Sequence, residues 1–336
     1  MRFVASLTRG ANELNTIARL WQESGDTRNP FEHVLITPLF IPKSGMAVIR
    51  SWKESGVIKN LYFDSGGFYV QMGRIDYVDL YFRLLQYYRC EQWADWYVLP
   101  DHVPLTGEVQ TRVWQKVRDT VEYSRNFLEE LPDDLKPRAI PVVHGHTHDQ
   151  ISYCLEHHLS LNTSYVGFGS FHTSGKKSSV NKLSGETYKT LSYIATTLVR
   201  KGVRLHGFGV GTPPVVYLLS AISVFSFDSI GWMKTAGFGK VFLPYIRAYN
   251  ITYFDKSATT IRERQFIEMK EATGHDCYFC RSFDRLHRER YYRTLHNLAV
   301  ILDMVGDNLD PIRARETIRK YSPDYTYLVG RNEQNL

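Results

Sequence analysis

The sequence contains little cysteine and no long apolar stretch, and both absences narrow the class of protein. Four cysteines occur in 336 residues, and only Cys277 and Cys280 are close together, so the disulfide framework of a secreted protein is not expected. The most apolar window, residues 213–227, is shorter than a membrane span and contains two prolines and three serines. Arg9 and Glu13 interrupt the first residues before a signal-peptide core could form. We therefore expect a cytoplasmic protein without a membrane segment.

Charge of either sign is not in large excess. Lys and Arg number 41 and Asp and Glu 35, so the formal net charge is +6, with a sequence pI near 9.0. This balance fits a polyanionic partner without requiring one, because many proteins with such a charge only have a solvated basic face. Hydrophobic residues make up 43% of the chain and aromatic residues 14%, which is enough for a large core and excludes a disordered chain.

Short runs of Val, Ile, Leu, Phe and Tyr alternate along the chain with longer stretches of helical spacing. Such alternation is typical of parallel strands joined by helices. Eight runs qualify as strands and predict an α/β fold of the (β/α)8 TIM-barrel type, with an open doubly wound sheet as the alternative. The expected strands are residues 33–40, 60–63, 96–100, 139–144, 164–168, 203–208, 223–227 and 240–244. Expected helices include 77–93, 107–131, 184–201 and 213–221.

The pattern changes after the last expected strand to a charged, cysteine-bearing stretch. We expect residues 1–336 to form a single barrel domain, with residues 258–300 as an appendage or insertion within it. No internal repeat is present, and no linker to an independent domain is expected.

Polar residues follow several of the expected strands directly. Asp64, Asp101 and Asp228 each come soon after an apolar run. In a parallel barrel the carboxyl ends of the strands carry the chemistry, so these carboxylates are expected on one face. Any one of them alone could simply cap a helix or form a turn. Two carboxylates across a pocket can divide the work of glycosyl transfer, one attacking the anomeric carbon and the other moving the proton.

Two stretches, DSGGF at residues 64–68 and GFGVGTPPVVYLLSAISVFSFDS at 207–229, resemble the tRNA-guanine transglycosylase family. The resemblance extends over roughly residues 60–297 and implies the barrel independently of the strand count. In the family's pattern Asp228 is the nucleophile and Asp64 the general acid/base, while Asp101 recognises the purine edge. The remaining substrate-binding candidates lie at or just after the ends of the second, fourth and fifth expected strands and are Ser65, Gly66, His144, Gly145, Gly167 and Gly169.

Departures from the family's pattern make the chain most similar to its DNA-modifying branch, the DNA-guanine transglycosylases. His144-Gly145 stands where the family usually has Gln-Gly, and residues 167–170 replace a usual Gly-Gly-Leu-Ala. The stretch after Cys280 is shorter than in tRNA enzymes, and no additional RNA-binding domain is expected after the barrel. The resemblance implies exchange of guanine in DNA for a 7-deazaguanine base such as 7-cyano-7-deazaguanine, with an ATPase as a plausible partner protein. A tRNA substrate is the nearest alternative.

A metal site is expected where the cysteines cluster. His275, Cys277 and Cys280 resemble the family's C-x-C-x-x-C spacing with histidine in the first place, and His296 resembles its distal histidine. Two thiolates and two imidazoles would hold Zn²⁺ in a closed, electrically neutral structural site. His287 is the substitute ligand if His275 is not one. The alternative is a pair of buried free cysteines with unrelated surface histidines.

Two other classes of function compete with base exchange. The motif Gly-His-Thr-His at residues 145–148 also occurs in binuclear metallophosphoesterases, but its usual companion motifs do not appear in the right order. A barrel that binds nucleic acid without catalysis is the second alternative, and the presence of both Asp64 and Asp228 argues against it.

Contact with nucleic acid is expected at one of two basic stretches, either of which could instead be a solvated face. The first is in the loop after residue 168 and comprises Lys176, Lys177 and Lys182. The second follows the cysteines and comprises Arg281, Arg285 and Arg288, which could share one side of a helix.

Overall fold

Parallel strands form a closed barrel in the computed structural model, which describes residues 1–171, 183–252, 260–306 and 310–332. The strand order is β5-β4-β3-β2-β1-β9-β8-β7-β6. The strands at its two ends, β5 (Ala139–Ile140) and β6 (Val142–Val143), are consecutive in the sequence and separated only by Pro141, which has no N–H to donate to a ladder. Together, β5 and β6 act as one strand interrupted at Pro141, which pairs with β4 on one side and with β7 on the other. Counted in this way, the closed barrel has eight strands.

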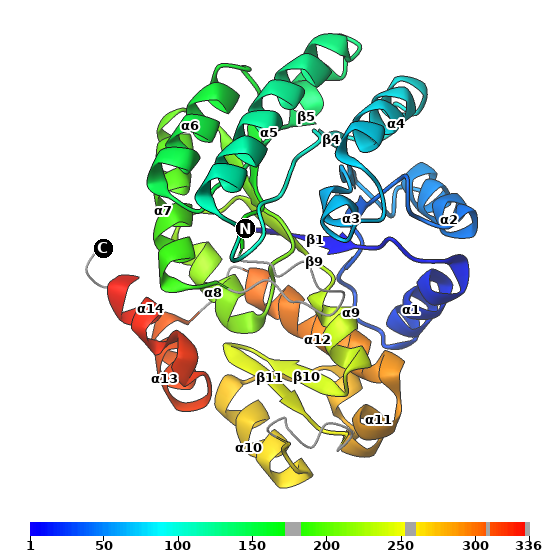
Figure 1. Cartoon of the computed structure of the whole chain (residues 1–336). Helices are drawn as coiled ribbons and strands as arrows, with labels where there is room; N and C mark the ends of the chain where they lie inside the picture. Colours follow the sequence, from blue (N-terminus) through cyan, green and yellow to red (C-terminus); the bar gives the residue numbers. More distant parts are fainter. Residues whose placement is uncertain (172–182, 253–259, 307–309, 333–336) are drawn as a thin grey trace.

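The predicted (β/α)8 TIM barrel is therefore confirmed, and every pairing within it is parallel. Figure 1 shows the helices arranged around the strands. The other barrel strands are β1 (Arg2–Ser6), β2 (His33–Ile36), β3 (Asn60–Phe63), β4 (Trp96–Val98), β7 (Tyr165–Phe168), β8 (Arg204–Gly207) and β9 (Ser226–Ser229).

One predicted strand is wrong, and one barrel strand is absent from the prediction. Residues 240–244 do not join the barrel: β10 (Lys240–Leu243) pairs antiparallel with β11 (Ile246–Asn250) in a separate hairpin. The barrel strand that the prediction lacked is β1, which pairs with both β2 and β9. An apolar run indicates a strand but not which strand it will pair with, so a strand of a local hairpin and a strand of the barrel look alike in the sequence.

The helices agree closely with the predicted ranges where these were given. Those flanking the barrel are α1 (Ala11–Glu23), α2 (Lys43–Glu54), α3 (Gly67–Gln71), α4 (Tyr77–Cys90), α5 (Gln110–Glu130), α6 (His148–Leu159), α7 (Gly185–Arg200), α8 (Pro213–Ala221) and α9 (Gly231–Gly237). The later helices are α10 (Glu263–Thr273), α11 (Phe283–Arg288), α12 (Arg290–Val305), α13 (Pro311–Tyr321) and α14 (Thr326–Asn332), with short 3-10 turns at Lys136–Arg138, Tyr278–Cys280 and Pro323–Tyr325. Among the described residues, no helix is both long and apolar enough to cross a membrane.

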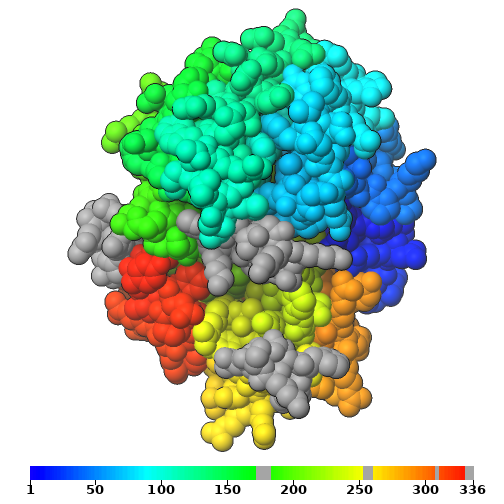
Figure 2. Space-filling model, viewed as in Figure 1, coloured from blue at the N-terminus to red at the C-terminus, as the bar shows by residue number. Residues whose placement is uncertain are grey.

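Helix α12 occupies the last position in the ring of helices. It packs against α9 and α8 and also against α1 and β1, the first elements of the chain. The hairpin, α10 and α11 lie between α9 and α12 in sequence, so they form an insertion in the final strand–helix unit. In the space-filling view the yellow, orange and red segments gather on one side of the molecule, across the face from the green and cyan helices (Figure 2).

The core has two parts. A small cluster fills the barrel interior, with one residue from each of seven consecutive strands: Val4, Leu35, Tyr62, Val98, Ile140, Val142 and Tyr165. A much larger cluster lies between the strands and the surrounding helices. Because the interior is filled by side chains, a ligand can enter only from the end of the barrel, as is usual for this fold.

Candidate active site and metal centre

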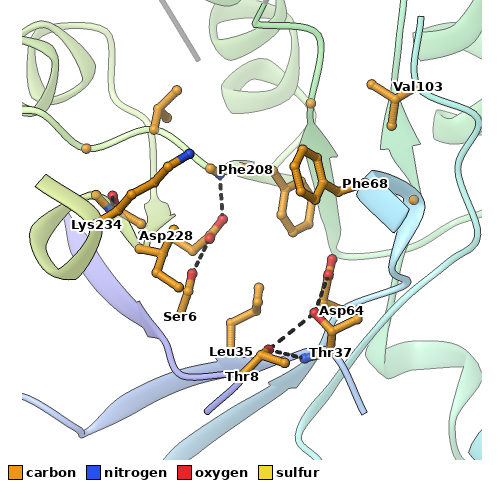
Figure 3. Close-up of a pocket in the computed structure, with 18 of the residues that line it drawn as sticks. Ser6, Thr8, Leu35, Thr37, Asp64, Phe68, Val103, Phe208, Asp228 and Lys234 are labelled. Carbon is orange, nitrogen blue, oxygen red and sulfur yellow. Dashed lines mark hydrogen bonds between the residues drawn. The ribbon is translucent and has the colours of Figure 1, made fainter. Parts of the chain in front are cut away.

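A pocket of about 580 Å³ lies at the carboxyl ends of the barrel strands. Its volume is within the range of ordinary small-molecule sites. Carboxylates from three strand ends line it: Asp64, Asp101 and Asp228. Figure 3 shows Asp64 and Asp228 on opposite sides of the pocket. The sequence-predicted residues that line the pocket are Asp64, Ser65, Asp101, Gly169 and Asp228, whereas Gly66, His144, Gly145 and Gly167 do not line it.

Asp228 is held by hydrogen bonds at both carboxylate oxygens. The Ser6 hydroxyl donates to Oδ2 over 2.5 Å, and the backbone N–H of Gly209 donates to Oδ1 over 2.8 Å. His206, which is fully buried, places Nε2 3.3 Å from Oδ1. Asp228 itself is only 5% exposed. The carboxylate is therefore fixed in orientation at the edge of the pocket (Figure 3).

Asp64 has a strongly raised pKa. Burial contributes most, and the negative charges of Asp101 and Asp228 add to it, so that the pKa of Asp64 is raised to about 7. The Thr37 hydroxyl donates to Oδ2 over 3.0 Å and opposes the rise, and Thr8 lies next to Thr37. A carboxyl group with this pKa can both donate and accept a proton near neutral pH.

Asp101 is also held at both oxygens, but from behind the pocket wall. The Ser65 hydroxyl donates to Oδ1 over 2.5 Å, and His144 Nε2 lies 2.8 Å from Oδ2. His144 is fully buried and thus touches the carboxylate instead of forming the pocket wall. The backbone N–H of Gly67 donates to Ser65 Oγ over 3.2 Å and fixes the hydroxyl in turn.

Two aromatic rings form further parts of the pocket wall. Phe68, which is 41% exposed, and Phe208 both line the pocket (Figure 3). A Cβ atom on Gly167 would lie 2.2 Å from the Phe208 ring, so glycine at this position makes room for that ring. Gly66 has φ +87° at the start of α3, where a residue with a side chain would be strained. Gly167 and Gly66 therefore shape the site from outside it.

Several site residues were not among the sequence predictions. Ser6, Thr8 and Thr37 come from the ends of β1 and β2, and His206 lies within β8, where it also contacts Ser226. Ser6 and Thr8 could have been found only by recognising residues 2–6 as a barrel strand. The alternation in RFVAS is too short to distinguish a strand from an N-terminal tail.

Near the later part of the chain, four predicted ligands form one cluster. The ligand atoms of His275, Cys277, Cys280 and His296 all lie within 4.8 Å of one another, and the cluster does not include His287. The fold thus brings His275, Cys277 and Cys280, which are close together in the sequence, next to His296 of α12. Four donors of this kind match the tetrahedral set that Zn²⁺ prefers.

The hydrogen bonds around the two histidines fit a metal ion. His296 Nε2 donates to the Phe242 carbonyl over 2.8 Å. The other ring nitrogen, Nδ1, therefore carries a lone pair that can bind a metal, and it lies 3.5 Å from Cys277 Sγ. His275 Nδ1 lies 2.6 Å from Asp303 Oδ2, and its Nε2 is buried without a hydrogen-bond partner among the described residues. A buried His275 Nε2 without a hydrogen-bond partner among the described residues, close to two thiols, is the arrangement expected of metal ligands.

The predicted nucleic-acid contacts are placed only in part. Lys176, Lys177 and Lys182 lie outside the described residues. Arg281 precedes α11, so it does not share a helix with the other two arginines. Arg285 forms an ion pair with Glu289 and lies over the Tyr292 ring, and Arg288 pairs with Asp284.

The Gly-His-Thr-His motif begins a helix. Thr147 is the N-cap of α6, and its hydroxyl accepts from the N–H of Gln150, whose side chain accepts from the Thr147 N–H. The His148 ring contacts the Tyr193 ring at a centroid distance of 4.7 Å, with the two rings tilted by 45°. The group of metal-binding side chains found among the described residues contains neither His146 nor His148, and the motif is accounted for as a capping box.

Fold and site together define a class: a (β/α)8 barrel with three carboxylates around one pocket and a two-histidine, two-cysteine cluster in its last strand–helix unit. Residues 92–315 match the family model of queuine tRNA-ribosyltransferases, and the chain belongs to this family. The family is one of guanine transglycosylases, which are pentosyltransferases. A comparison with curated proteins finds no match.

The matched range includes Asp101, Asp228 and all four residues of the cluster. Asp64 lies before it. The family match therefore says nothing about Asp64, and it is the structure that places Asp64 opposite Asp228 in the pocket (Figure 3).

Proposed function

We propose that the protein replaces guanine in DNA with a 7-deazaguanine base, such as 7-cyano-7-deazaguanine, through a covalent aspartyl-glycosyl intermediate. The observation that carries the proposal is the pair Asp228 and Asp64 on one pocket, with the pKa of Asp64 raised to about 7. One carboxylate fixed by donors and one carboxyl group able to exchange a proton are the two groups that glycosyl exchange needs.

Asp228 is the nucleophile in the first step. Its carboxylate oxygen attacks C1′ of the target deoxyguanosine, and the bond between C1′ and N9 breaks with its electrons moving to guanine. The protonated Asp64 gives its proton to the leaving base. The hydrogen bonds from Ser6 and from the Gly209 N–H hold the attacking carboxylate in one orientation, which reduces the entropy lost on reaching the transition state.

The second step reverses the first with a different base. The incoming 7-deazaguanine loses its N9 proton to the Asp64 carboxylate, and its nitrogen attacks C1′. The ester bond between C1′ and Asp228 breaks, and the carboxylate is restored. Two inversions give overall retention at C1′.

The pocket offers surfaces suited to a planar base. Phe68 and Phe208 provide aromatic faces, and Asp101 provides two acceptor oxygens at the wall. Because C1′ and the base edge are shielded in a duplex, the target nucleotide must be flipped out, at a cost of a few kcal/mol. An ATPase partner that opens the duplex is consistent with this cost.

DNA as the substrate is supported by the chain's own departures from the family's usual residues. The position of the usual Gln holds His144, whose ring is turned to Asp101 and away from the pocket. The name of the matching family model refers to tRNA, so tRNA is the second candidate and must be tested beside DNA.

Zinc is proposed as the metal of the cluster. His275, Cys277, Cys280 and His296 would hold it, and as a closed four-ligand site it would supply folding energy to the insertion rather than reaction chemistry.

The deciding experiment measures guanine release. Protein is incubated with DNA or tRNA that carries labelled guanine, with and without 7-cyano-7-deazaguanine, and the nucleosides are then identified by mass spectrometry. The proposal expects labelled guanine to be released from DNA, with a 7-deazaguanine deoxynucleoside formed in its place. Release from tRNA alone would support the second candidate. Binding to DNA without release of guanine from either nucleic acid would favour a non-catalytic barrel.

A further inference from the structure

We propose that His144 is a positioning residue that fixes the Asp101 carboxylate for recognition of the purine edge, and that it does not itself contact the base. This inference rests on the proposed function, because it concerns the base-binding pocket. His144 follows β6 and is fully buried. The pocket is lined by Asp101 but not by His144.

The hydrogen bonds around His144 determine where its proton lies. The backbone N–H of Gly145 donates to Ser170 Oγ over 3.1 Å, and His144 Nδ1 lies 2.9 Å from the same oxygen. The serine hydroxyl has one proton, and with its oxygen already accepting from Gly145 it can give that proton to Nδ1. His144 then carries a proton on Nε2, 2.8 Å from Asp101 Oδ2, and donates it to the carboxylate.

Asp101 consequently has one internal donor on each oxygen. Ser65 donates to Oδ1 and His144 to Oδ2, and Ser65 is fixed by the Gly67 N–H. Two donors at the two oxygens set the plane of the carboxylate. The remaining lone pairs are available to the pocket, which Asp101 lines.

Packing leaves this arrangement little freedom. A Cβ atom on Gly169 would lie 2.8 Å from His144 Cε1, and a Cβ atom on Gly67 would lie 2.7 Å from Asp101 Oδ1. Glycine at these two positions makes room for the imidazole and the carboxylate. Asp101 and Ser170 are almost fully buried as well, with 7% and 3% exposure.

The chemical consequence is selectivity for a base with two adjacent donors. A carboxylate with a fixed plane can accept from two neighbouring N–H groups at once, as guanine and 7-deazaguanines present at N1 and the 2-amino group. Hypoxanthine has the N1 donor but no 2-amino group, so it can satisfy only one oxygen. A site built around such a pair discriminates strongly because one lone pair of the buried carboxylate is then left without a donor.

The test compares two substitutions at position 144. His144→Gln retains an amide N–H that can reach Asp101, and His144→Leu removes the donor while keeping an apolar volume. The kcat/KM for base release is measured on DNA that carries either guanine or hypoxanthine at the target nucleotide. His158→Gln is the matched control, because His158 is also fully buried but bonds the Val142 carbonyl and not Asp101.

We expect the preference for guanine over hypoxanthine to fall about tenfold or more in His144→Leu and to stay within about threefold of wild type in His144→Gln. The control should also retain the wild-type preference. A His144→Leu protein that folds, loses activity equally on both DNAs and keeps the wild-type ratio would overturn the inference while leaving the proposed function intact. A wild-type protein that releases neither base would instead refute the proposed function, and the inference with it.

Discussion

Ser6 and Asp228 are separated by 222 positions in the sequence, yet the Ser6 hydroxyl donates a 2.5 Å hydrogen bond to the Asp228 carboxylate. The contact follows from the pairing of β1 with β9, in which Val4 lies opposite Asp228 and Ala5 opposite Ser229. The first strand of the barrel therefore helps to position the proposed nucleophile on the last. A segment at the start of the chain is part of the proposed active site for this reason.

Removing this hydrogen bond should slow the reaction without unfolding the protein. We expect Ser6→Ala to lower kcat/KM for guanine release by roughly tenfold or more, because a hydrogen bond to a charged group contributes about 1.5–3 kcal/mol. Ser55→Ala serves as the control, since the Ser55 hydroxyl donates to the Trp52 carbonyl on an exposed helix end, away from the pocket. Equal rates for Ser6→Ala and wild type would show that Asp228 is oriented by other contacts.

Replacing Asp228 should abolish the covalent intermediate. Wild-type protein incubated with DNA and no incoming base should give a protein–DNA adduct on a denaturing gel, and Asp228→Ala should give none, because no other carboxylate is proposed to attack C1′. The thermal melting temperature of the variant provides the folding control. An adduct formed by Asp228→Ala would assign the nucleophile to another residue.

Replacing Asp64 should remove the proton transfer in both steps. We expect Asp64→Asn to slow guanine release by roughly 10²- to 10⁴-fold, as is usual for the loss of a general acid/base. With the wild-type pKa raised to about 7, guanine release in a single turnover should decline as the pH rises above 7, since the protonated carboxyl is the donor. A pH-independent rate between 5 and 9 in wild type would contradict this role.

The same pKa makes a prediction about stability. Folding raises the pKa of Asp64 from an ordinary value near 3.8 to about 7, so between these values Asp64 binds more protons in the native state than in the unfolded state, and its contribution to stability falls with rising pH. Asp64→Asn removes this loss. The variant should gain roughly 2–4 kcal/mol over wild type between pH 4 and pH 8, measured by urea unfolding at each pH.

Metal retention should depend on residues outside the four ligands. Asp303 contacts His275 Nδ1 and also pairs with Arg28 over 2.6 Å, so it holds the ring with Nε2 facing the thiols. We expect Cys277→Ser to lose stoichiometric zinc, and Asp303→Ala to bind zinc about 10- to 100-fold more weakly in competition with a chelator. Asp324→Ala, which loses an exposed pair with Arg247, should bind like wild type. Full zinc occupancy in Cys277→Ser by elemental analysis would place the metal elsewhere.

The arginines after the cysteines remain a predicted nucleic-acid contact. Reversing Arg285 and Arg288 to Glu should weaken binding to all DNA sequences to a similar extent and flatten the plot of log affinity against log salt by about one unit per lost phosphate contact. Both arginines already pair with acidic neighbours, so Arg264→Glu, in an exposed pair on α10, is a suitable control. Unchanged affinity and slope would move the contact to Lys176, Lys177 and Lys182 or to a partner protein.

The fold class and several candidate site residues could be predicted from the sequence, because they depend on patterns among residues close together in the chain. The alternation of apolar runs and helical stretches predicted the barrel, and α7 and α8 lie where the spacing placed them. Asp64, Asp101 and Asp228 were identified as site residues because they follow strands, and in a parallel barrel every strand delivers its carboxyl end to the same face. The four metal-binding candidates were identified by their resemblance to the family's ligand pattern, and the structure brings their ligand atoms together.

Tertiary structure decided which of these residues meet and in what role. Strand pairing placed Ser6 on Asp228 and assigned residues 240–243 to a hairpin, since partners distant in sequence leave no mark on a local pattern. Burial and neighbouring charge raised the pKa of Asp64, and both depend on groups that folding brings together. His144 was correctly located at a strand end, but only packing against Ser170 turned its ring to Asp101 and away from the pocket.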